Sequence, residues 1–488
     1  MSKEPSLPRT PAQPVSRRSA LRMAGTGGLV TAGGALLGTV PAPPAAAAAS
    51  VAAVIGGLGT PPTYAPSGRR PRHRRATWSQ QFQTGHGWTA AGAGTASAEA
   101  NDTSVFVRGT QSVRVTTNGT NKQSYVRKTG MTTMDLTGKM IRLVFRVEDT
   151  TNLSKLAFYL GTGSFANYFS WTFHAHSTTS ANYVQSGEWV TVHLQWADVT
   201  SAAGTFSLSA AGVPSAKSGF TDMSFAVYDN AGGPVTYRLQ AVELIPDTTA
   251  VFPKGAVSIT FDDSHLSIHD LARPAMDAYG FPGTSYNIAE AAGTSDYLSV
   301  EQMRSLQDFS GWDMEGHAYA MAAHTADYSK LTAQEVDTDL RQLREWMVAN
   351  GFTGEHFAYP HGAFQKTTDS VPVDLIAGRH FTTARSIISE TIESFAPAMP
   401  YRLKALTGIN DGSGIGGTTL ANLTAAGGRL DRCANNGDWL ILCLHRIVEG
   451  TPAASTEISR AGLATLMAAI AGRGIPVVTV SEAMAYYT

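Results

Sequence analysis

Hydrophobic and polar positions follow two different periods along the 488 residues of this chain. Between about residues 78 and 247, short segments alternate apolar and polar side chains, as in SVRVTT, MIRLVFRV and EWVTVHLQW. Turn residues separate these segments, and no long stretch has the 3.6-residue period of a helix. A period of two in short, evenly spaced segments is typical of antiparallel strands. The pattern therefore predicts an all-β sandwich over 78–247.

From about residue 254 the pattern changes. Apolar runs such as AVSITF, HFAYP, WLILCL and IPVVTV alternate with amphipathic stretches such as TAQEVDTDLRQLREWMVANG. Alternating strands and helices predict a parallel β/α domain over 254–488, with residues 245–255 as the joint. In such folds the carboxyl ends of the strands form the functional edge of the sheet.

The N-terminus has the features of an export signal. Arg17 and Arg18 precede a long stretch without charges, and small residues crowd positions 45–53. Twin arginines before a mildly apolar segment indicate the bacterial twin-arginine route, and small residues favour cleavage. We expect a signal peptide over 1–50, a Pro/Gly/Arg-rich linker over 51–77, and a secreted or cell-surface protein without stable membrane insertion. A retained anchor is the alternative, although many glycines and alanines make a spanning helix marginal.

The balance of charge excludes some classes of partner. The formal net charge is -1, but residues 1–75 hold ten of the 37 basic residues and one of the 38 acidic ones. The rest of the chain thus carries 27 basic against 37 acidic residues, which makes it a poor general binder of nucleic acid. Two cysteines, Cys433 and Cys443, are too few for a disulfide framework, and the sequence leaves their pairing open.

Two segments of the β/α domain carry candidate metal ligands and bases. The strand AVSITFDDSH ends in Asp262 and Asp263, of which one could bind a metal and the other act as a base. Alternatively, one of these acids caps the following helix. The segment WDMEGHAYAMAAHT offers His317 and His324, and imidazoles are common ligands of zinc.

Two further segments carry candidate groups for an acyl-transfer reaction. In HFAYPHGAF, the residues around His361 form a turn that could present a backbone N–H to a developing oxyanion. In LILCLHR, an apolar strand ends at His445, a candidate general acid. No GxSxG motif lies near these histidines, which argues against a covalent serine esterase.

In this order, the four segments resemble the motifs of the polysaccharide deacetylase family, carbohydrate esterase family 4. The resemblance covers roughly 254–488, and TFDDS is similar to that family's TFDDG. It implies a distorted (β/α) barrel in which Asp262 is the catalytic base. It also implies that Asp263 binds a divalent metal, usually zinc, together with His317 and His324.

The other two motifs imply roles by the same resemblance. PHG at 360–362 resembles the family's Pro-Tyr-Gly corner, so the backbone N–H of His361 would contact the oxyanion. LCLH at 442–445 resembles its Leu-x-His motif, so His445 would protonate the leaving group.

The spacing of the two histidines departs from the family pattern. They are usually four residues apart, whereas His317 and His324 are seven apart. On one continuous helix they would lie about 10.5 Å apart along the axis, too far for one zinc. We therefore expect AYAMAA to form a loop. Otherwise water, His265 or His269 would complete the site.

An arginine is also missing. The family's third motif often begins with an arginine that orients the base, and Ala358 stands there in this chain. A downstream aspartate–tryptophan motif has no clear counterpart, and Arg385 and Asp411 are two candidate substitutes.

The predicted sandwich resembles a jelly-roll carbohydrate-binding module. Several of its aromatic residues could stack on sugar rings if they face outward, although aromatic residues in a sandwich more often form the core: Tyr168, Trp171, Phe173, Trp189 and Trp196.

These observations together predict an exported metal-dependent hydrolase that removes acetyl groups from an N- or O-acetylated polysaccharide. One alternative is an amidase that cleaves a non-sugar C–N bond with the same metal site. Another is a surface protein that binds glycans and has lost its activity. Chitin, peptidoglycan, acetylxylan and a secreted exopolysaccharide all fit the sequence as substrates.

Overall fold

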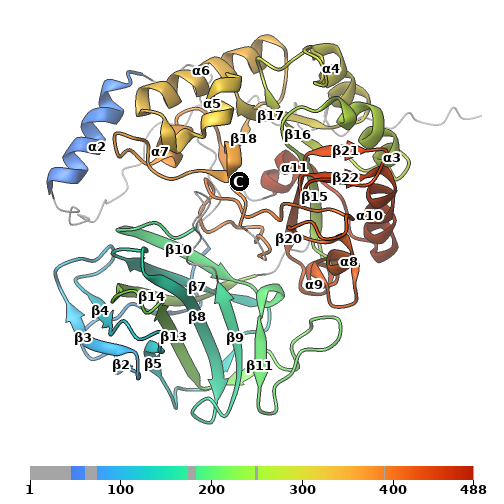
Figure 1. Ribbon diagram of the computed structural model, residues 1–488. Helices are drawn as coiled ribbons and strands as arrows, with labels where there is room; N and C mark the ends of the chain where they lie inside the picture. Colours follow the sequence, from blue (N-terminus) through green and yellow to red (C-terminus); the bar gives the residue numbers. More distant parts are fainter. Residues whose placement is uncertain (1–44, 61–73, 174–182, 248–250, 389–390, 487–488) are drawn as a thin grey trace, which may run out of the picture. The chain divides into compact units, whose positions relative to one another are not determined.

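A computed structural model describes residues 45–60, 74–173, 183–247, 251–388 and 391–486 (Figure 1). The twin arginines and most of the predicted signal peptide lie outside these residues. Residues Pro41–Thr488 cluster into one compact unit, which holds both the all-β region and the β/α region. Within the described residues, none of the helices has the length and apolar character that a membrane crossing requires.

The segment at the predicted end of the signal peptide and start of the linker is helical. Helix α2 spans Ala45–Gly57, and Val54 and Ile55 pack against the hydrophobic core. The guanidinium of Arg379 donates to the carbonyl oxygens of Ile55, Leu58 and Gly59 at 3.4, 3.4 and 2.9 Å. A cation that donates to the last carbonyls of a helix stabilises its C-terminal end.

The all-β region contains two larger antiparallel sheets in the described part of the chain. The first has the order β10-β7-β14-β4-β3, and β1 pairs with β14. Its strands are β1 (Trp78–Gln80), β3 (Thr95–Asp102), β4 (Ser112–Thr117), β7 (Lys139–Val147), β10 (Glu188–Leu194) and β14 (Thr236–Pro246).

The second sheet has the order β11-β9-β8-β13-β5-β2. Its strands are β2 (Thr89–Ala91), β5 (Ser124–Lys128), β8 (Leu153–Thr162), β9 (Asn167–Phe173), β11 (Ser201–Ala203) and β13 (Asp222–Asp229). A small pair, β6 (Met134–Asp135) and β12 (Ser218–Phe220), and the short helix η1 (Trp196–Asp198) complete the region.

The apolar faces of the two sheets pack against each other. Phe225 of β13 lies with its ring centroid 5.3 Å from that of Phe145 in β7 and 5.8 Å from that of Tyr237 in β14. Trp171 and Trp196 are 1% and 3% exposed, so both belong to the core and neither is available to stack on a sugar. Tyr168 and Trp189 are half-buried, and the side chain of Phe173 lies outside the described residues.

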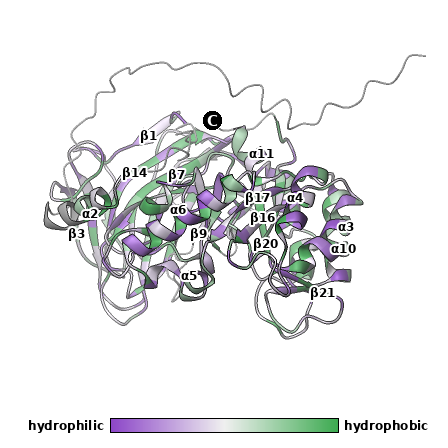
Figure 2. Cartoon of the chain, turned by 90° about the horizontal axis from the view of Figure 1, so that it is seen from above, coloured by the Kyte–Doolittle hydropathy of each residue, from purple (hydrophilic) through white to green (hydrophobic). Residues whose placement is uncertain are grey.

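The β/α region is built on a parallel sheet with the order β19-β18-β17-β16-β15-β20. The strands are buried along their length, as expected when helices cover the faces of a parallel sheet. Figure 2 shows apolar strands with helices that carry hydrophilic residues around them. Their bounds are β15 (Ala256–Phe261), β16 (Thr284–Ile288), β17 (Asp313–Ala318), β18 (His356–Ala358), β19 (Thr383–Arg385) and β20 (Trp439–Leu444).

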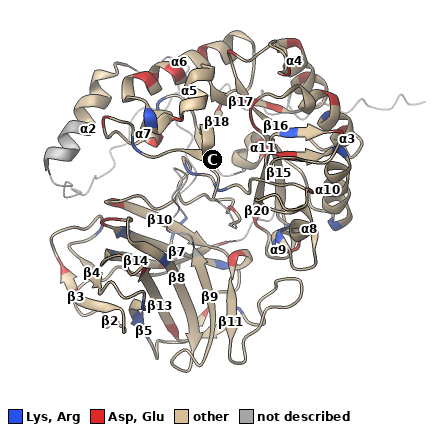
Figure 3. Cartoon of the chain, viewed as in Figure 1, with Lys and Arg blue, Asp and Glu red and all other residues tan. Residues whose placement is uncertain are grey.

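Helices connect and cover these strands, and Figure 3 shows acidic and basic residues interspersed on them. Two of the longer ones begin with a capping box, Ser299 with Gln302 and Thr332 with Glu335. The larger elements are α3 (Arg273–Asp277), α4 (Val300–Phe309), α5 (Met321–Ala326), α6 (Ala333–Ala349), α7 (Val373–Ala377), α8 (Leu420–Thr424), α9 (Arg429–Asn436), α10 (Arg460–Arg473) and α11 (Val480–Ala485). The short ones are η2 (Ile268–Ala272), η3 (Tyr328–Lys330), η4 (Pro360–Gly362), β21 (Arg446–Val448) and β22 (Glu457–Ser459).

A further segment joins the two edge strands of this sheet. Leu403 pairs in parallel with Arg385 of β19, and Leu406 pairs in parallel with Leu442 of β20. The backbone of Leu406 donates to the carbonyl of Ile441 and accepts from the N–H of Cys443. The outer edges of β19 and β20 are therefore linked through residues 403–406.

Candidate functional site

The candidate residues come together at the carboxyl ends of neighbouring strands. Asp262 and Asp263 follow the last residue of β15, His317 is the penultimate residue of β17, and His445 follows β20. Parallel strands end at the same edge of a sheet, so side chains distant in sequence meet there.

Asp263 lies at the centre of a group of imidazoles. Its Oδ1 is 2.9 Å from Nε2 of His324 and 3.3 Å from Nε2 of His317, and its Oδ2 is 3.7 Å from Nε2 of His265. Burial raises the pKa of Asp263, but hydrogen bonds from these three histidines outweigh it and hold the pKa far below its usual range. The carboxylate is therefore an anion that faces several nitrogen atoms.

Three of these residues fit a divalent metal. One ligand atom each from Asp263, His317 and His324 lies within 4.8 Å of the others. Nδ1 of His317 donates to the carbonyl oxygen of Ala358 at 2.8 Å, which leaves Nε2 free to act as a ligand. One carboxylate and two imidazoles are a usual protein contribution to catalytic zinc, because a further position stays open.

A sharp turn brings His317 and His324 together although they are seven residues apart in the sequence. His317 lies in β17, Tyr319 and Ala320 form a bend, and His324 lies in α5, which begins at Met321. The two imidazole rings are 4.9 Å apart between centroids. The expected loop is thus a two-residue turn followed by a helix, and the histidines do not share one continuous helix.

Asp262 is held by an arginine and is nearly inaccessible, with 4% exposure. Nη2 of Arg385 lies 2.5 Å from Oδ1 and from Oδ2 of the carboxylate. Burial raises the pKa of Asp262, but the positive charge of Arg385 outweighs it, with smaller contributions from His317 and His445, so the pKa is lowered. Asp262 is therefore ionised and fixed in orientation.

Arg385 is the residue whose importance the sequence did not establish. In the pairing of β18 with β19, Arg385 is the register partner of Ala358, the position where the family's arginine is missing. A guanidinium thus reaches Asp262 from the adjacent strand at the same level of the sheet. Asp411, the other candidate substitute, accepts hydrogen bonds from Ser459 at the start of α10.

His445 is half-buried beside Asp262. Its Nε2 lies 4.0 Å from Oδ2 of Asp262. Its Nδ1 is buried and has no hydrogen-bond partner among the described residues. Burial lowers the pKa of His445 despite the opposing effects of Asp262 and Asp263.

His361 occupies a conformation that is unusual for a residue with a side chain. Its φ of 56° and ψ of 13° lie in the left-handed region, where non-glycine residues are strained and cluster at functional sites. Its Nε2 donates to the carbonyl oxygen of His324 at 3.1 Å, and the two rings are 5.5 Å apart. The exposed side chain of His361 therefore also borders the group around Asp263, which the sequence did not predict.

The other histidines and the cysteines that the sequence singled out differ in their distance from Asp262 and Asp263. His265 stacks on Tyr297 at 5.6 Å and lies beside Asp263. His269 instead contacts Asp270 at 2.8 Å and Arg273 at 3.2 Å. Both cysteines are free and buried, and Sγ of Cys443 lies 3.4 Å from Oδ2 of Asp262.

A cavity of about 510 Å³ lies apart from these residues, between the all-β region and the β/α region. Its walls include Trp171, Thr200, Thr391, Thr418 and Arg429, and none of the candidate catalytic or metal-binding residues lines it.

Comparison with known proteins identifies the class of the β/α region. Residues 250–375 match the model of the polysaccharide deacetylase family. This part of the chain is therefore a polysaccharide deacetylase domain, as the motifs predicted. The match contains Asp262, Asp263, His317, His324 and His361, whereas Arg385 and His445 lie beyond its end.

Two curated relatives share this part of the sequence. The poly-β-1,6-N-acetyl-D-glucosamine N-deacetylase of Staphylococcus epidermidis is 30% identical over 121 residues, 23% of this chain and 42% of the relative. The protein of the same name from Staphylococcus aureus is 26% identical over 137 residues, 26% of this chain and 47% of the relative. The chain thus spans less than half the length of these relatives.

Solved structures give weaker likenesses. The Xyl-CE4 domain of a multidomain xylanase from the hindgut metagenome of Trinervitermes trinervoides is 16% identical, with a TM-score of 0.30 over 48% of this chain and 91% of that one. A family 4 acetyl xylan esterase from Clostridium thermocellum is also 16% identical, with a TM-score of 0.30 over 47% and 91%. A TM-score of 0.30 is too low to establish a shared fold.

Proposed function

We propose that this protein is a metal-dependent deacetylase that removes acetyl groups from a polysaccharide. The observation that carries the proposal is the arrangement at the ends of β15 and β17. Asp263, His317 and His324 place their ligand atoms within 4.8 Å of one another. A second carboxylate, Asp262, is ionised and fixed by Arg385 directly beside them. The names of the two staphylococcal relatives favour an N-acetylated polymer of glucosamine as substrate.

The metal would be held by Asp263, His317 and His324, and we propose zinc because the donor set is one carboxylate and two imidazoles. When bound, such an ion supplies a Lewis acid for water and for the acetyl carbonyl. Asp262 then takes the proton from the attacking water. Its lowered pKa keeps it ionised at neutral pH, and Arg385 keeps its oxygen atoms in one orientation.

Two further groups complete the proposed reaction. The backbone N–H of His361, held in its turn by the left-handed conformation, would donate to the oxyanion of the tetrahedral intermediate. His445 would protonate the departing nitrogen or oxygen. Nε2 of His445 lies 4.0 Å from Oδ2 of Asp262, so one bridging water would relay the proton that Asp262 accepts to this imidazole. The products are acetate and a free amine or hydroxyl on the sugar.

The observations that favoured an inactive protein have structural explanations. The long spacing between the histidines is accommodated by the turn at Tyr319, and the arginine missing at Ala358 is replaced from β19 by Arg385. An amidase with a non-sugar substrate uses the same groups and stays the second candidate. A hydrolase of either kind fits the site better than a protein that binds glycans without cleaving them.

We also propose the finer description of the fold and the location. The link through residues 403–406 supports a distorted barrel, and the two packed sheets support a sandwich, for which we propose a jelly-roll topology. The boundaries at 50, 77, 247 and 254 and export by the twin-arginine route are proposals from the sequence. Replacing Arg17 and Arg18 with lysine should hold the precursor in the cytoplasm, and unchanged secretion would contradict this route.

Acetate release tests the proposed activity. We would supply poly-β-1,6-N-acetylglucosamine, chitin, peptidoglycan and acetylxylan, each with the protein as prepared, after treatment with a chelator, and after addition of zinc. We expect release from at least one polymer, loss after chelation and recovery with zinc. Release that is insensitive to chelation would contradict the metal, and release of ammonia or an amine from non-sugar amides alone would favour the amidase.

A further inference from the structure

The bend between the two histidine ligands is held by a carboxylate from another helix. The backbone N–H of Tyr319 donates to Oδ2 of Asp339 at 3.0 Å, and the N–H of Ala320 donates to Oδ1 at 2.9 Å. Ala320 is the N-cap residue of α5, and Ala323 stands at the third helical position, where the glutamate of a capping box would accept from the N-cap N–H. Asp339 thus supplies from α6 the acceptors that the local sequence lacks.

Asp339 is itself fixed in place. Its exposure is 6%, and Oη of Tyr328 donates to its Oδ2 at 2.5 Å. The carboxylate therefore accepts three hydrogen bonds, two of them from consecutive backbone groups. The next N–H, of Met321, donates to Oε2 of Glu290 at 2.9 Å. Because Glu290 is exposed, water can replace it, whereas the buried Asp339 has no such substitute.

We propose that Asp339 is a positioning residue of the metal site, which sets the direction in which α5 leaves β17. This inference rests on the proposed metal-dependent function. Helix α5 has six residues, too few to be stable without outside contacts, so the elements around it must determine its direction. The turn that Asp339 holds returns the chain within two residues, and His324 then lies 2.9 Å from Asp263.

Without the turn, the two histidines would be too far apart to bind one metal ion. If residues 317–324 continued as one helix, the two histidines would be about 10.5 Å apart along its axis. The imidazoles of His317 and His324 are instead 4.9 Å apart. Residues that support metal ligands typically change metal affinity by about 10- to 100-fold when they are replaced. Loss of Asp339 should therefore weaken metal binding although it contacts neither histidine side chain.

Asp339→Asn in the full chain tests this role. The variant keeps the shape but exchanges one acceptor oxygen for an amide NH₂. In either orientation this NH₂ faces a backbone N–H, that of Tyr319 or that of Ala320. In a titration of zinc against a competing chelator, we expect an affinity about 10- to 100-fold below that of the parent. Parent affinity in this variant would overturn the inference.

Asp337→Asn is the matched control. Asp337 lies on the same helix, is 4% exposed, and pairs with Arg379 and His380 at 2.8 Å, away from the turn. We expect it to lower the unfolding midpoint of the zinc-free protein by at least as much as Asp339→Asn, with the zinc affinity of the parent. Equal losses of affinity in the two variants would overturn the specific role of Asp339.

Tyr328→Phe decides the question if Asp339→Asn does not fold. It removes one of the three hydrogen bonds to Asp339 and leaves its carboxylate in place. We expect zinc affinity to fall by about threefold to tenfold, the usual worth of one hydrogen bond, and parent affinity would overturn the inference. A parent protein that binds no zinc would overturn the proposed metal-dependent function, and this inference with it. Zinc binding by the parent with unaffected variants overturns the inference alone.

Discussion

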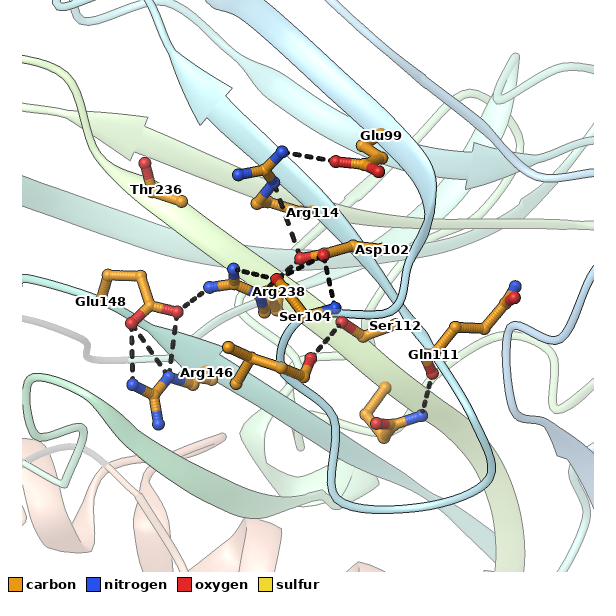
Figure 4. A network of polar contacts seen from close by, with 12 residues as sticks. Glu99, Asp102, Ser104, Gln111, Ser112, Arg114, Arg146, Glu148, Thr236 and Arg238 are labelled. Atoms are coloured by element: carbon orange, nitrogen blue, oxygen red, sulfur yellow. Dashed lines mark hydrogen bonds and ion pairs between the residues drawn. The ribbon is translucent and has the colours of Figure 1, made fainter. Parts of the chain in front are cut away.

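The all-β region and the β/α region each hold a partly buried cluster of charged side chains, and the two clusters are built from different partners. In the all-β region, Arg238 donates to Asp102 at 2.9 Å and also contacts Glu148 (Figure 4). Arg146 makes a bidentate contact with Glu148 at 2.8–3.0 Å, and Arg114 approaches Asp102 at 3.6 Å. In the β/α region, Asp263 faces imidazoles instead.

The two clusters differ in the type of basic side chain that faces the acids, which is a guanidinium in the all-β region and an imidazole around Asp263. A guanidinium is always protonated and offers N–H groups in a fixed plane, so the acids of the first cluster are satisfied by donors and have no role for a metal. A neutral imidazole carries a lone pair that can bind a metal instead of a proton. Around Asp263, imidazole nitrogens and an anionic oxygen converge, and a divalent cation that replaced the shared protons would be held by this set of atoms.

Asp262 has both types of neighbour. The guanidinium of Arg385 contacts its carboxylate, and the imidazole of His445 lies 4.0 Å away. Arg385 keeps Asp262 ionised by lowering its pKa, as the hydrogen bonds from Ser104 and the guanidinium of Arg238 do for Asp102. The difference is that the buried Nδ1 of His445 has no hydrogen-bond partner among the described residues. Buried polar groups are normally satisfied, so an unpartnered nitrogen next to an ionised acid fits the proton transfer that we propose for His445.

The largest effect should follow from removing the base. Asp262→Asn keeps the size of the side chain but takes away the proton acceptor, so the turnover rate should fall about 10²- to 10⁴-fold on the polymer that the parent deacetylates. Acetate release measures the rate, and metal analysis should show nearly parent content, because Asp263 is the proposed ligand.

Asp102→Asn is the control for that experiment. It changes a buried acid of the other cluster, so its rate should stay within about twofold of the parent's. Loss of metal in Asp262→Asn but not in Asp263→Asn would show that the two adjacent carboxylates exchange their proposed roles.

The next effect concerns the third ligand. His324→Ala removes an imidazole that lies 2.9 Å from Asp263, so zinc affinity should fall by at least about 100-fold, with partial recovery of activity at high zinc. A chelator titration measures it. His269→Ala should match the parent, since His269 contacts Asp270 and Arg273. His265→Ala also tests the site, because His265 lies 3.7 Å from Asp263, and a loss as large as that of His324→Ala would make it a ligand.

A third change probes the structural cluster. Arg238→Met removes the guanidinium between Asp102 and Glu148 but leaves Ser104 and Arg114 as partners of Asp102. The free energy of unfolding should therefore fall by about 2 kcal/mol, the scale of a hydrogen bond to a charged group, as measured by urea denaturation. Zinc affinity should not change. A loss of zinc binding in this variant would mean that the two clusters are coupled.

The sequence predicted the candidate residues at the strand ends, but it did not predict which side chains of neighbouring strands contact them. Alternating patterns located the all-β region and the parallel sheet, and the motifs identified Asp262, Asp263, His317 and His445 because each lies at or near a strand end. Arg385 could not be assigned in this way. Its contact with Asp262 depends on the register of β18 and β19, which the sequence of either strand alone does not determine.

The same limit applies to the turn before α5. The spacing of His317 and His324 showed that the chain must bend, but the acceptors of the bend lie on Asp339, about 20 residues further along the chain. The tryptophans illustrate the opposite case. Periodicity placed Trp171 on one of two faces, and packing of the second sheet decided that this face is the core.

The smallest effect should appear in the dependence of stability on pH. Burial raises the pKa of Asp102, but hydrogen bonds from Ser104 and the charge of Arg238 outweigh it, so the folded pKa is below the unfolded value of about 3.9. A lowered pKa stabilises the fold above the unfolded value, and this contribution is lost as the pH falls through the folded pKa. Asp102→Asn should therefore be less stable than the parent at pH 7, and the two urea midpoints should converge as the pH falls from about 5 through the folded pKa of Asp102. A constant difference across this range would mean that Asp102 contributes through its shape and not through its charge.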